Sequence, residues 1–222
     1  MASEESYPDL ISLAAHELRT PANVVWGYLR MLQGDSTPAF GERQRHMIDE
    51  AEKSCARLAE LMAELSELGK LDRGQIAMAR RPVDLFGLVG EAAGAVREAE
   101  ERGVRLEVRG ASGGAVIEGD PDRLRAAMSA IFRAILREQP GPCTIVADRT
   151  RSTAPGSSTA MIVVADESRI QAAHDAPDGA FNDKRGGLGL ALPIARRVIE
   201  AHGGELRSRP DGGAAMQFRL AT

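Results

Sequence analysis

A histidine, an acid and a hydroxyl stand close together near the start of the chain, in the stretch His16-Glu17-Leu18-Arg19-Thr20-Pro21. An imidazole has an ordinary pKa near neutral, so its neutral, nucleophilic form is available at physiological pH. A carboxylate beside it can take up the proton that the ring loses when a nitrogen attacks an electrophile. The stretch therefore suits nucleophilic chemistry. The alternative is that the His-Glu pair is simply part of a solvated helix surface and has no chemical role.

Two long helices are expected to position this stretch. Apolar residues recur at alternating spacings of four and three over about residues 8–34, as in a heptad seam, and again over about residues 40–69. The seam takes Ala15 and Leu18, so His16, Glu17 and Thr20 fall outside it. His16 and Thr20 are four residues apart and share one solvent-facing side of the helix.

The link between the two helices, residues 34–38, reads Gly-Asp-Ser-Thr-Pro and predicts a helical hairpin. Pro21 removes one backbone donor and is expected to bend the first helix beside the histidine. Met31, Leu61 and Leu68 make the apolar stripes wider than one hairpin can bury. We expect two hairpins to form a dimeric four-helix bundle. The alternative is a hairpin packed on the second domain of its own chain.

After Gly69 the pattern changes to short alternating segments separated by helical ones. Strands are expected near 76–81, 104–108, 115–119, 143–148, 160–166 and 214–220, and helices near 83–98, 120–138 and 190–201. Strands grouped with helices on one face predict an α/β sandwich, so the fold class is α+β. The expected domains are residues 1–72 and 73–222.

Composition and charge exclude several classes of protein. The net charge of the 222 residues is −4, and acids and bases are interspersed with no Lys/Arg run longer than two, so no nucleic-acid partner is expected. The sequence has no run of about 18 apolar residues, so no membrane span is predicted. We expect a cytoplasmic protein, or the cytoplasmic portion of a receptor with an upstream sensor region. Cys55 and Cys143 are expected to be buried free thiols.

The stretch at 16–21, at the start of a helical hairpin, resembles the phospho-accepting box of sensor histidine kinases. Further segments look like that family's other boxes: residues 120–125 the start of the N box, 163–166 the strand entering the G1 box, 187–192 the G2 box, and 196–204 the helix that follows it. The resemblance covers the chain from about Tyr7 onward.

The resemblance implies a dimerisation and histidine-phosphotransfer hairpin followed by a catalytic ATP-binding sandwich domain. In the family, the box histidine, here His16, takes the γ-phosphoryl group of ATP with the adjacent acid, here Glu17, as base. The group then passes to an aspartate on a response-regulator receiver domain. The residue at the position of Thr20 positions water, together with the acid, to dephosphorylate that regulator. A homodimer and a receiver domain are the implied partners.

The implied ATP site departs from the family pattern in its N box. Ala130 and Ala134 stand where the family has two asparagines, the second of which holds Mg²⁺, and no asparagine occurs between Asn23 and Asn182. Without that amide ligand, the ion and the charge on the transferring phosphoryl group are poorly stabilised. We therefore expect ATP and Mg²⁺ binding to be weak or lost, and we assign no metal ligand.

The other nucleotide-binding positions are partly retained. Asp166, which in the family bonds the adenine amine, is present without the G1 glycines, and Arg137 stands where the family has a lysine, next to a glutamate in place of an aromatic. Gly187 and Gly189 precede a helix and would form a phosphate cradle, or else only allow close helix–strand packing. The segment 171–185, in the place of the ATP lid, is short and polar and is expected to be mobile.

Three functions follow from these observations. The first is a two-component signalling module in which His16 exchanges a phosphoryl group with a receiver aspartate, while autophosphorylation from ATP is feeble or absent. The second is an ATP-dependent sensor histidine kinase that tolerates the altered N box. The third is a non-enzymatic scaffold that docks a response regulator.

Overall fold

The computed structural model describes residues 7–34, 41–154, 157–183, 185–187 and 189–220. The chain divides into two compact units, Met1–Ile76 and Ala77–Thr222, and each is described by itself. Among the described residues no helix is both long and apolar enough to cross a membrane.

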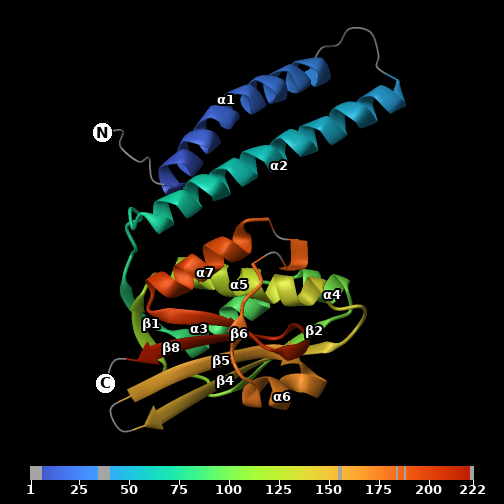
Figure 1. Cartoon of the computed structure of the whole chain (residues 1–222). Helices are drawn as coiled ribbons and strands as arrows, with labels where there is room; N and C mark the ends of the chain where they lie inside the picture. The colour runs from blue at the N-terminus through green and yellow to red at the C-terminus, as the bar shows by residue number, and fades with distance from the viewer. Residues whose placement is uncertain (1–6, 35–40, 155–156, 184, 188, 221–222) are drawn as a thin grey trace, which may run out of the picture. The chain divides into compact units, whose positions relative to one another are not determined.

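The first unit is a helical hairpin, as predicted. Helices α1 (Tyr7–Gly34) and α2 (Glu42–Asp72) pack along each other (Figure 1). The backbone N–H of Gly41, just before α2, donates to the side chain of Gln44 at 2.9 Å and caps the helix. Most of the predicted link, residues 35–38, lies outside the described residues.

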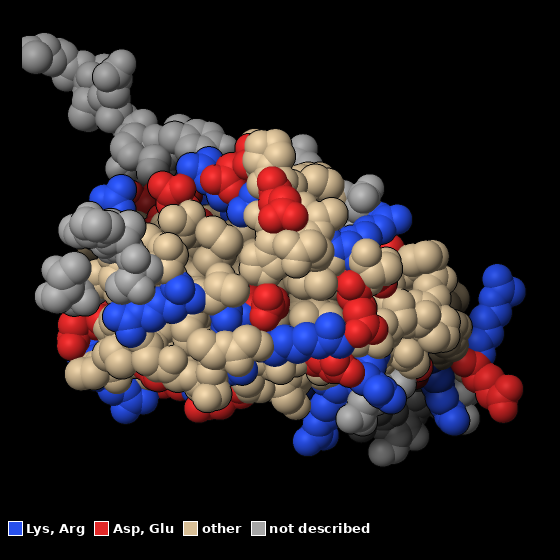
Figure 2. Space-filling model, turned by 90° about the horizontal axis from the view of Figure 1, so that it is seen from below, with Lys and Arg blue, Asp and Glu red and all other residues tan. Residues whose placement is uncertain are grey.

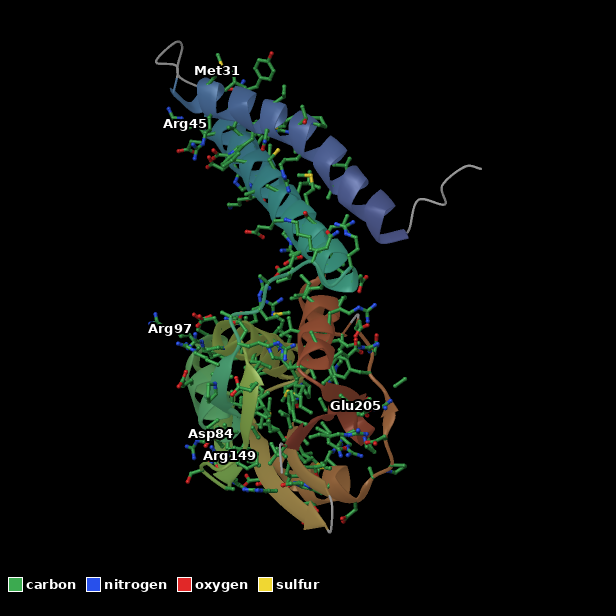
Figure 3. All side chains as sticks on the ribbon, turned by 90° about the vertical axis from the view of Figure 1, so that its left-hand side faces the viewer. Met31, Arg45, Asp84, Arg97, Arg149 and Glu205 are labelled. Carbon is green, nitrogen blue, oxygen red and sulfur yellow. The ribbon has the colours of Figure 1, made fainter. Side chains whose placement is uncertain are left out.

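The apolar seam of the hairpin is only partly covered within one chain. Ala15, Cys55 and Met62 are buried, but Leu18 is 56% exposed and Met31 is 65% exposed. Met31 projects from the end of α1 in Figure 3. Among the hairpin residues whose burial the structure describes, the other large apolar side chains that are exposed are Val24, Val25, Tyr28, Leu32, Met47 and Leu58.

The second unit contains the strands and the shorter helices of the chain. Its strands are β1 (Arg81–Asp84), β2 (Arg105–Gly110), β3 (Val116–Gly119), β4 (Thr144–Ala154), β5 (Ser157–Asp166), β6 (Gly179–Ala180), β7 (Gly204–Ser208) and β8 (Ala214–Leu220). Its helices are α3 (Leu85–Gly94), α4 (Glu98–Glu101), α5 (Pro121–Arg137), α6 (Ile170–Asp175) and α7 (Ala191–Ala201), with 3₁₀ turns at Glu167–Arg169, Arg185–Gly187 and Pro210–Gly212.

The main sheet has the strand order β2-β4-β5-β8-β7-β6, and β1 pairs with β3 in a separate two-stranded ladder. Helices α3, α5 and α7 lie on one side of the six-stranded sheet, and α6 lies on the other (Figure 1). Both faces of strand β5 are therefore covered. Val163 and Ala165 pack against Ala173 of α6, and Ile162 and Val164, which point to the opposite face, are also fully buried. The predicted mixed α/β domain is therefore present, but its helices are not confined to one face.

Three predicted elements differ from the structure. The strand expected at 76–81 begins only at Arg81, because the segment before it bonds to a side chain rather than to a ladder: Ala79 N–H donates to Asp120 Oδ2 at 3.1 Å. The helix expected at 83–98 begins only after Asp84, which ends β1 and caps α3. The loop expected near 149–159 is largely strand, since β4 and β5 pair from Ile145–Asp166 out to Ala154–Ser157.

The cap of α3 joins three segments of the second unit. The Asp84 carboxylate accepts hydrogen bonds from Phe86 N–H at 3.0 Å and Gly114 N–H at 2.7 Å, and Arg149 donates to Phe86 O at 2.7 Å. Asp84 and Arg149 lie near each other in Figure 3. Burial opposes ionisation of Asp84, but the backbone N–H donors outweigh it and hold the pKa of Asp84 below its usual value.

The ends of α5 and α7 match the sequence prediction, and they are joined by a buried histidine. Asp120 caps α5, and Gly203, with φ of 73°, follows the C-terminal cap of α7 at His202. His202 Nε2 accepts from the Asp120 backbone N–H at 2.9 Å, so its proton is on Nδ1, which donates to Val198 O at 2.6 Å. The imidazole is therefore neutral in the folded chain.

This histidine predicts a pH dependence of stability. Burial lowers the pKa of His202 below its ordinary value, so on acidification the unfolded chain takes up a proton at this ring before the folded chain does. The stabilisation is present above pH about 6.5 and is lost as the pH falls below it. We expect His202→Gln to be less stable than wild type at pH 7.5 but to lose less melting temperature between pH 7.5 and 5.5. Equal losses in both proteins would contradict the assignment.

Candidate functional site

The three predicted catalytic residues lie on one continuous helix. His16, Glu17 and Thr20 all belong to α1, which continues through Pro21 without a break. Thr20 is exposed, one turn after His16. The side chains of His16 and Glu17 lie outside the description, so their placement is that of their helix positions.

The second unit carries a cavity of about 690 Å³ where the end of β5 faces the end of α5. Asp166, the predicted adenine ligand, lies on its wall together with Glu138 and Cys143. The further lining residues are Gln139, Pro140, Gly141, Pro142, Ser168, Arg169 and Gly212.

The Asp166 carboxylate is already engaged within the chain. Its Oδ1 accepts hydrogen bonds from the Ser168 hydroxyl at 2.5 Å and from Ser168 N–H at 2.9 Å, which begins a 3₁₀ turn where the family has glycines. The hydroxyl bond from Ser168 outweighs burial and lowers the pKa of Asp166 below its usual value. Burial and the nearby Asp166 charge raise the pKa of the Cys143 thiol. Cys55 is buried as predicted, but Cys143 is only half-buried because it borders the cavity.

The glycine turn of the predicted phosphate cradle lies against α5. Gly186 has φ of 66°, and a Cβ placed on it would lie 2.6 Å from Ala134 Cα and 3.0 Å from Ala134 O. Gly187 belongs to the same 3₁₀ turn, and Gly189, with φ of 62°, precedes α7. The backbone of this turn therefore lies beside the position where the resemblance places the Mg²⁺-binding asparagine.

An ion pair holds the same turn. Arg185 is 8% exposed, and its Nε donates to Glu138 Oε2 at 3.0 Å while Nη1 donates to Gly213 O at 3.2 Å. Its Nη2 bonds both Glu138 and Gly212 O. Glu138 thus contacts Arg185 at the position where the family has an adenine-lining aromatic.

The described part of the predicted lid has several anchors. Phe181 is 6% exposed, and its ring lies near two guanidinium groups, 5.6 Å from Arg185 and 5.9 Å from Arg196. Arg196 also approaches Asp183 at 2.8 Å. Burial raises the pKa of Asp183 above its usual value. The mobility expected for this segment stays a prediction.

The structure brings some of the predicted binding residues together and not others. Asp166 is on the cavity, the glycine turn is on α5, and Arg137 is exposed at the last turn of α5. Sequence reasoning missed Arg185 and did not include Gly186 in the G2 run. The sequence shows Arg185 directly before the glycines and Glu138 where the family has an aromatic residue. Neither observation reveals that the two side chains pair across 47 residues.

Charged side chains of both signs are interspersed on the face shown in Figure 2. On strand β2, Arg109 bonds Glu107 at 2.7 Å and also bonds Glu167. Farther along the sheet, Arg207 of β7 bonds Glu205 at 2.8 Å. Pairing of this kind leaves no large field of one sign along these strands.

Two family models match the chain. Residues 9–74 match the His Kinase A (phospho-acceptor) domain, and residues 119–222 match the histidine kinase-, DNA gyrase B- and HSP90-like ATPase. Both units therefore match the two parts of one protein family in the expected order. The chain belongs to the sensor histidine kinase family.

Curated relatives of this histidine kinase chain include other signalling proteins. It is 29% identical to the signal transduction histidine-protein kinase BaeS of Escherichia coli over 96% of this chain and 46% of that protein. It is 30% identical to the sensor protein CutS of Streptomyces coelicolor over 93% of this chain and 50% of that protein. The chain thus spans about half the length of these relatives, or less.

Two solved structures share the fold of this histidine kinase chain. One is full-length ShkA in complex with AMPPNP, with a TM-score of 0.65 and 23% identity over 97% of this chain and 46% of that one. The other is the Acinetobacter baumannii histidine kinase AdeS, with a TM-score of 0.55 and 17% identity over 93% of this chain and 97% of that one.

Proposed function

We propose that His16 carries a phosphoryl group that it exchanges with the aspartate of a response-regulator receiver domain. The observation that carries this proposal is the match of residues 9–74 to a phospho-acceptor domain, together with His16 on α1 in the stretch that resembles the family's phospho-accepting box. Thr20, one turn away, is exposed, which leaves that side of the helix open to a partner.

The exchange balances with groups that the two proteins supply. A ring nitrogen of His16 forms a P–N bond as the P–O bond to the receiver aspartate breaks, and the aspartate leaves as a carboxylate. Glu17 takes the imidazole proton, and the reverse reaction returns it. Hydrolysis of the aspartyl phosphate uses a water that Thr20 and Glu17 position on the same helix.

The second unit does not fit the Mg²⁺–ATP that its family implies. Ala134 offers no ligand atom, and the turn at Gly186 lies directly against it. Asp166 Oδ1 is already bonded by Ser168. We therefore propose that autophosphorylation from ATP is weak or absent, and we assign no step to that nucleotide.

A homodimer completes the proposal. The apolar side chains exposed on α1 and α2, such as Leu18 and Met31, support burial against a second hairpin, which would make a four-helix bundle.

An active ATP-dependent kinase is the second candidate. It is favoured by the retained Asp166 on a cavity, by the glycines before α7, and by the ATPase family match. A docking scaffold without chemistry is the third, and it would use the same exposed helix face.

The test begins from a receiver domain carrying ³²P on its aspartate. We expect label to appear on this chain, or inorganic phosphate to be released faster than from the receiver alone. If neither is observed, only the docking scaffold remains. Two further measurements distinguish the active kinase from the other two candidates. Only the active kinase should bind Mg²⁺–ATP in a calorimetric titration, and only it should become labelled on His16 by [γ-³²P]ATP.

Thr20 separates hydrolysis from transfer. We expect Thr20→Ala to slow phosphate release from the labelled receiver by about tenfold or more, because the hydroxyl no longer positions water, while label transfer to His16 changes less than about threefold. Thr20→Ser is the matched control and should retain most of the hydrolysis. An equal loss of both reactions in Thr20→Ala would contradict this role.

A further inference from the structure

We propose that Arg185 and Glu138 form a latch that holds the glycine turn on α5 and so closes the face where a nucleoside triphosphate would bind. This inference deepens the proposed function, because it rests on the loss of the nucleotide site and names the contact that replaces the ligand. It depends on groups in the second unit alone and not on His16.

The latch is built from a buried arginine with acceptors on three sides. Arg185 is 8% exposed and donates to the Glu138 carboxylate, to Gly212 O and to Gly213 O. A guanidinium is suited to such a set, because its five N–H donors can reach a carboxylate and two carbonyls at the same time. The Phe181 ring, 5.6 Å from the guanidinium carbon, adds an apolar surface beside the pair.

The second part of the latch is a close backbone contact. Gly186 approaches α5 this closely because it has no side chain: a Cβ on Gly186 would lie 2.6 Å from Ala134 Cα and 3.1 Å from Ala134 Cβ. An asparagine at 134 would add three further heavy atoms beside this turn, because the Ala134 Cβ already borders it. We infer that the alanine favours closure in addition to removing a metal ligand.

These two contacts lie four residues apart, at Ala134 in the last turn of α5 and at Glu138, which caps the C-terminus of that helix, and they meet two consecutive residues of the turn. The two departures from the family pattern therefore act together: Ala134 leaves room for the turn, and Glu138 binds it through Arg185. Opening the turn for a triphosphate would separate Arg185, which is buried, from the partly exposed Glu138 carboxylate, and a buried guanidinium that loses its charged partner is unfavourable.

Hydrogen exchange of the full chain tests the latch. We expect the amides of residues 181–183 and 185–187 to be protected in wild type without ligand, and their exchange to be unchanged by millimolar Mg²⁺–ATP. In Glu138→Ala they should exchange at least about tenfold faster, because Arg185 loses its carboxylate partner. Peptides from the middle of α5 report whether the variant is folded.

Two further variants keep the test decisive. Glu138→Gln retains the shape of the side chain and removes only its charge, so it should also accelerate exchange of the turn. It replaces Glu138→Ala in the test if that variant does not fold. Arg197→Ala removes a half-exposed arginine of α7 that pairs with Glu200 at 3.3 Å, and it should leave residues 185–187 protected.

Each outcome is informative. A wild-type turn that exchanges as fast as in Glu138→Gln, with no effect of Mg²⁺–ATP, overturns the latch and leaves the proposed function intact. A wild-type turn whose exchange changes on addition of Mg²⁺–ATP overturns both the latch and the loss of nucleotide binding. Protection in wild type, its loss in the Glu138 variants and no effect of Mg²⁺–ATP support the latch.

Discussion

Replacing His16 by glutamine should abolish the transfer of label from a phosphorylated receiver to this chain, a loss of at least about 1,000-fold. Glutamine is polar and favours helices, so α1 should persist. Its amide nitrogen, however, is not a nucleophile, because its lone pair is delocalised into the carbonyl. The measurement is the initial rate of ³²P transfer, with helicity checked by circular dichroism.

His46→Gln is the matched control for this variant. His46 lies exposed on α2 of the same unit and matches no phospho-accepting box, so its replacement should leave transfer unchanged within about twofold. If His16→Gln still accepted label at a comparable rate, phosphoryl transfer would have to use another residue, and the proposed function would be wrong.

Replacing Phe132 by alanine should destabilise the second unit by about 3–5 kcal/mol. Phe132 lies in α5 and is 1% exposed, so the substitution removes an aromatic ring from the core and leaves a cavity. Because α5 also carries Ala134 and is capped by Glu138, we expect the turn at Gly186 to lose protection from hydrogen exchange as well. Urea denaturation followed by circular dichroism measures the change.

A second substitution in the same helix isolates the effect of burial. Ala126 is exposed on α5, and Ala126→Ser should change stability by no more than about 0.5 kcal/mol. A loss below about 1 kcal/mol in Phe132→Ala would mean that the core around α5 relaxes to fill the space, and the helix would then be a poor rigid support for the latch.

The elements with strong local signals were predicted closely from the sequence. Helix α5 begins at an Asp-Pro cap, α7 ends before Gly203, and β8 covers Ala214–Leu220 as expected. Each is specified by residues within a few positions of its ends or by alternation along one strand, so no distant partner is needed to find it.

The elements that were wrong or missed depend on pairing that their own residue patterns do not show. The extension of β4 and β5 beyond the predicted strands follows from their pairing with each other and with β8, and their Ser- and Thr-rich ends carry no apolar alternation. The segment before β1 is held by Asp120, 41 residues later, and so was mistaken for a strand.

The sequence by itself predicted which chemistry to expect: a histidine with an adjacent acid on a helix, in a stretch that resembles the family's phospho-accepting box, and a second domain with alanines where the family has two asparagines. Only the tertiary structure decided what fills the place of those amides. Arg185 and Glu138 are 47 residues apart, and Gly186 meets Ala134 only after the sheet has brought the turn to α5. Side-chain types can be read locally, but a buried pairing is selected by the packing of the whole domain, because only there are its charges desolvated and its alternatives excluded.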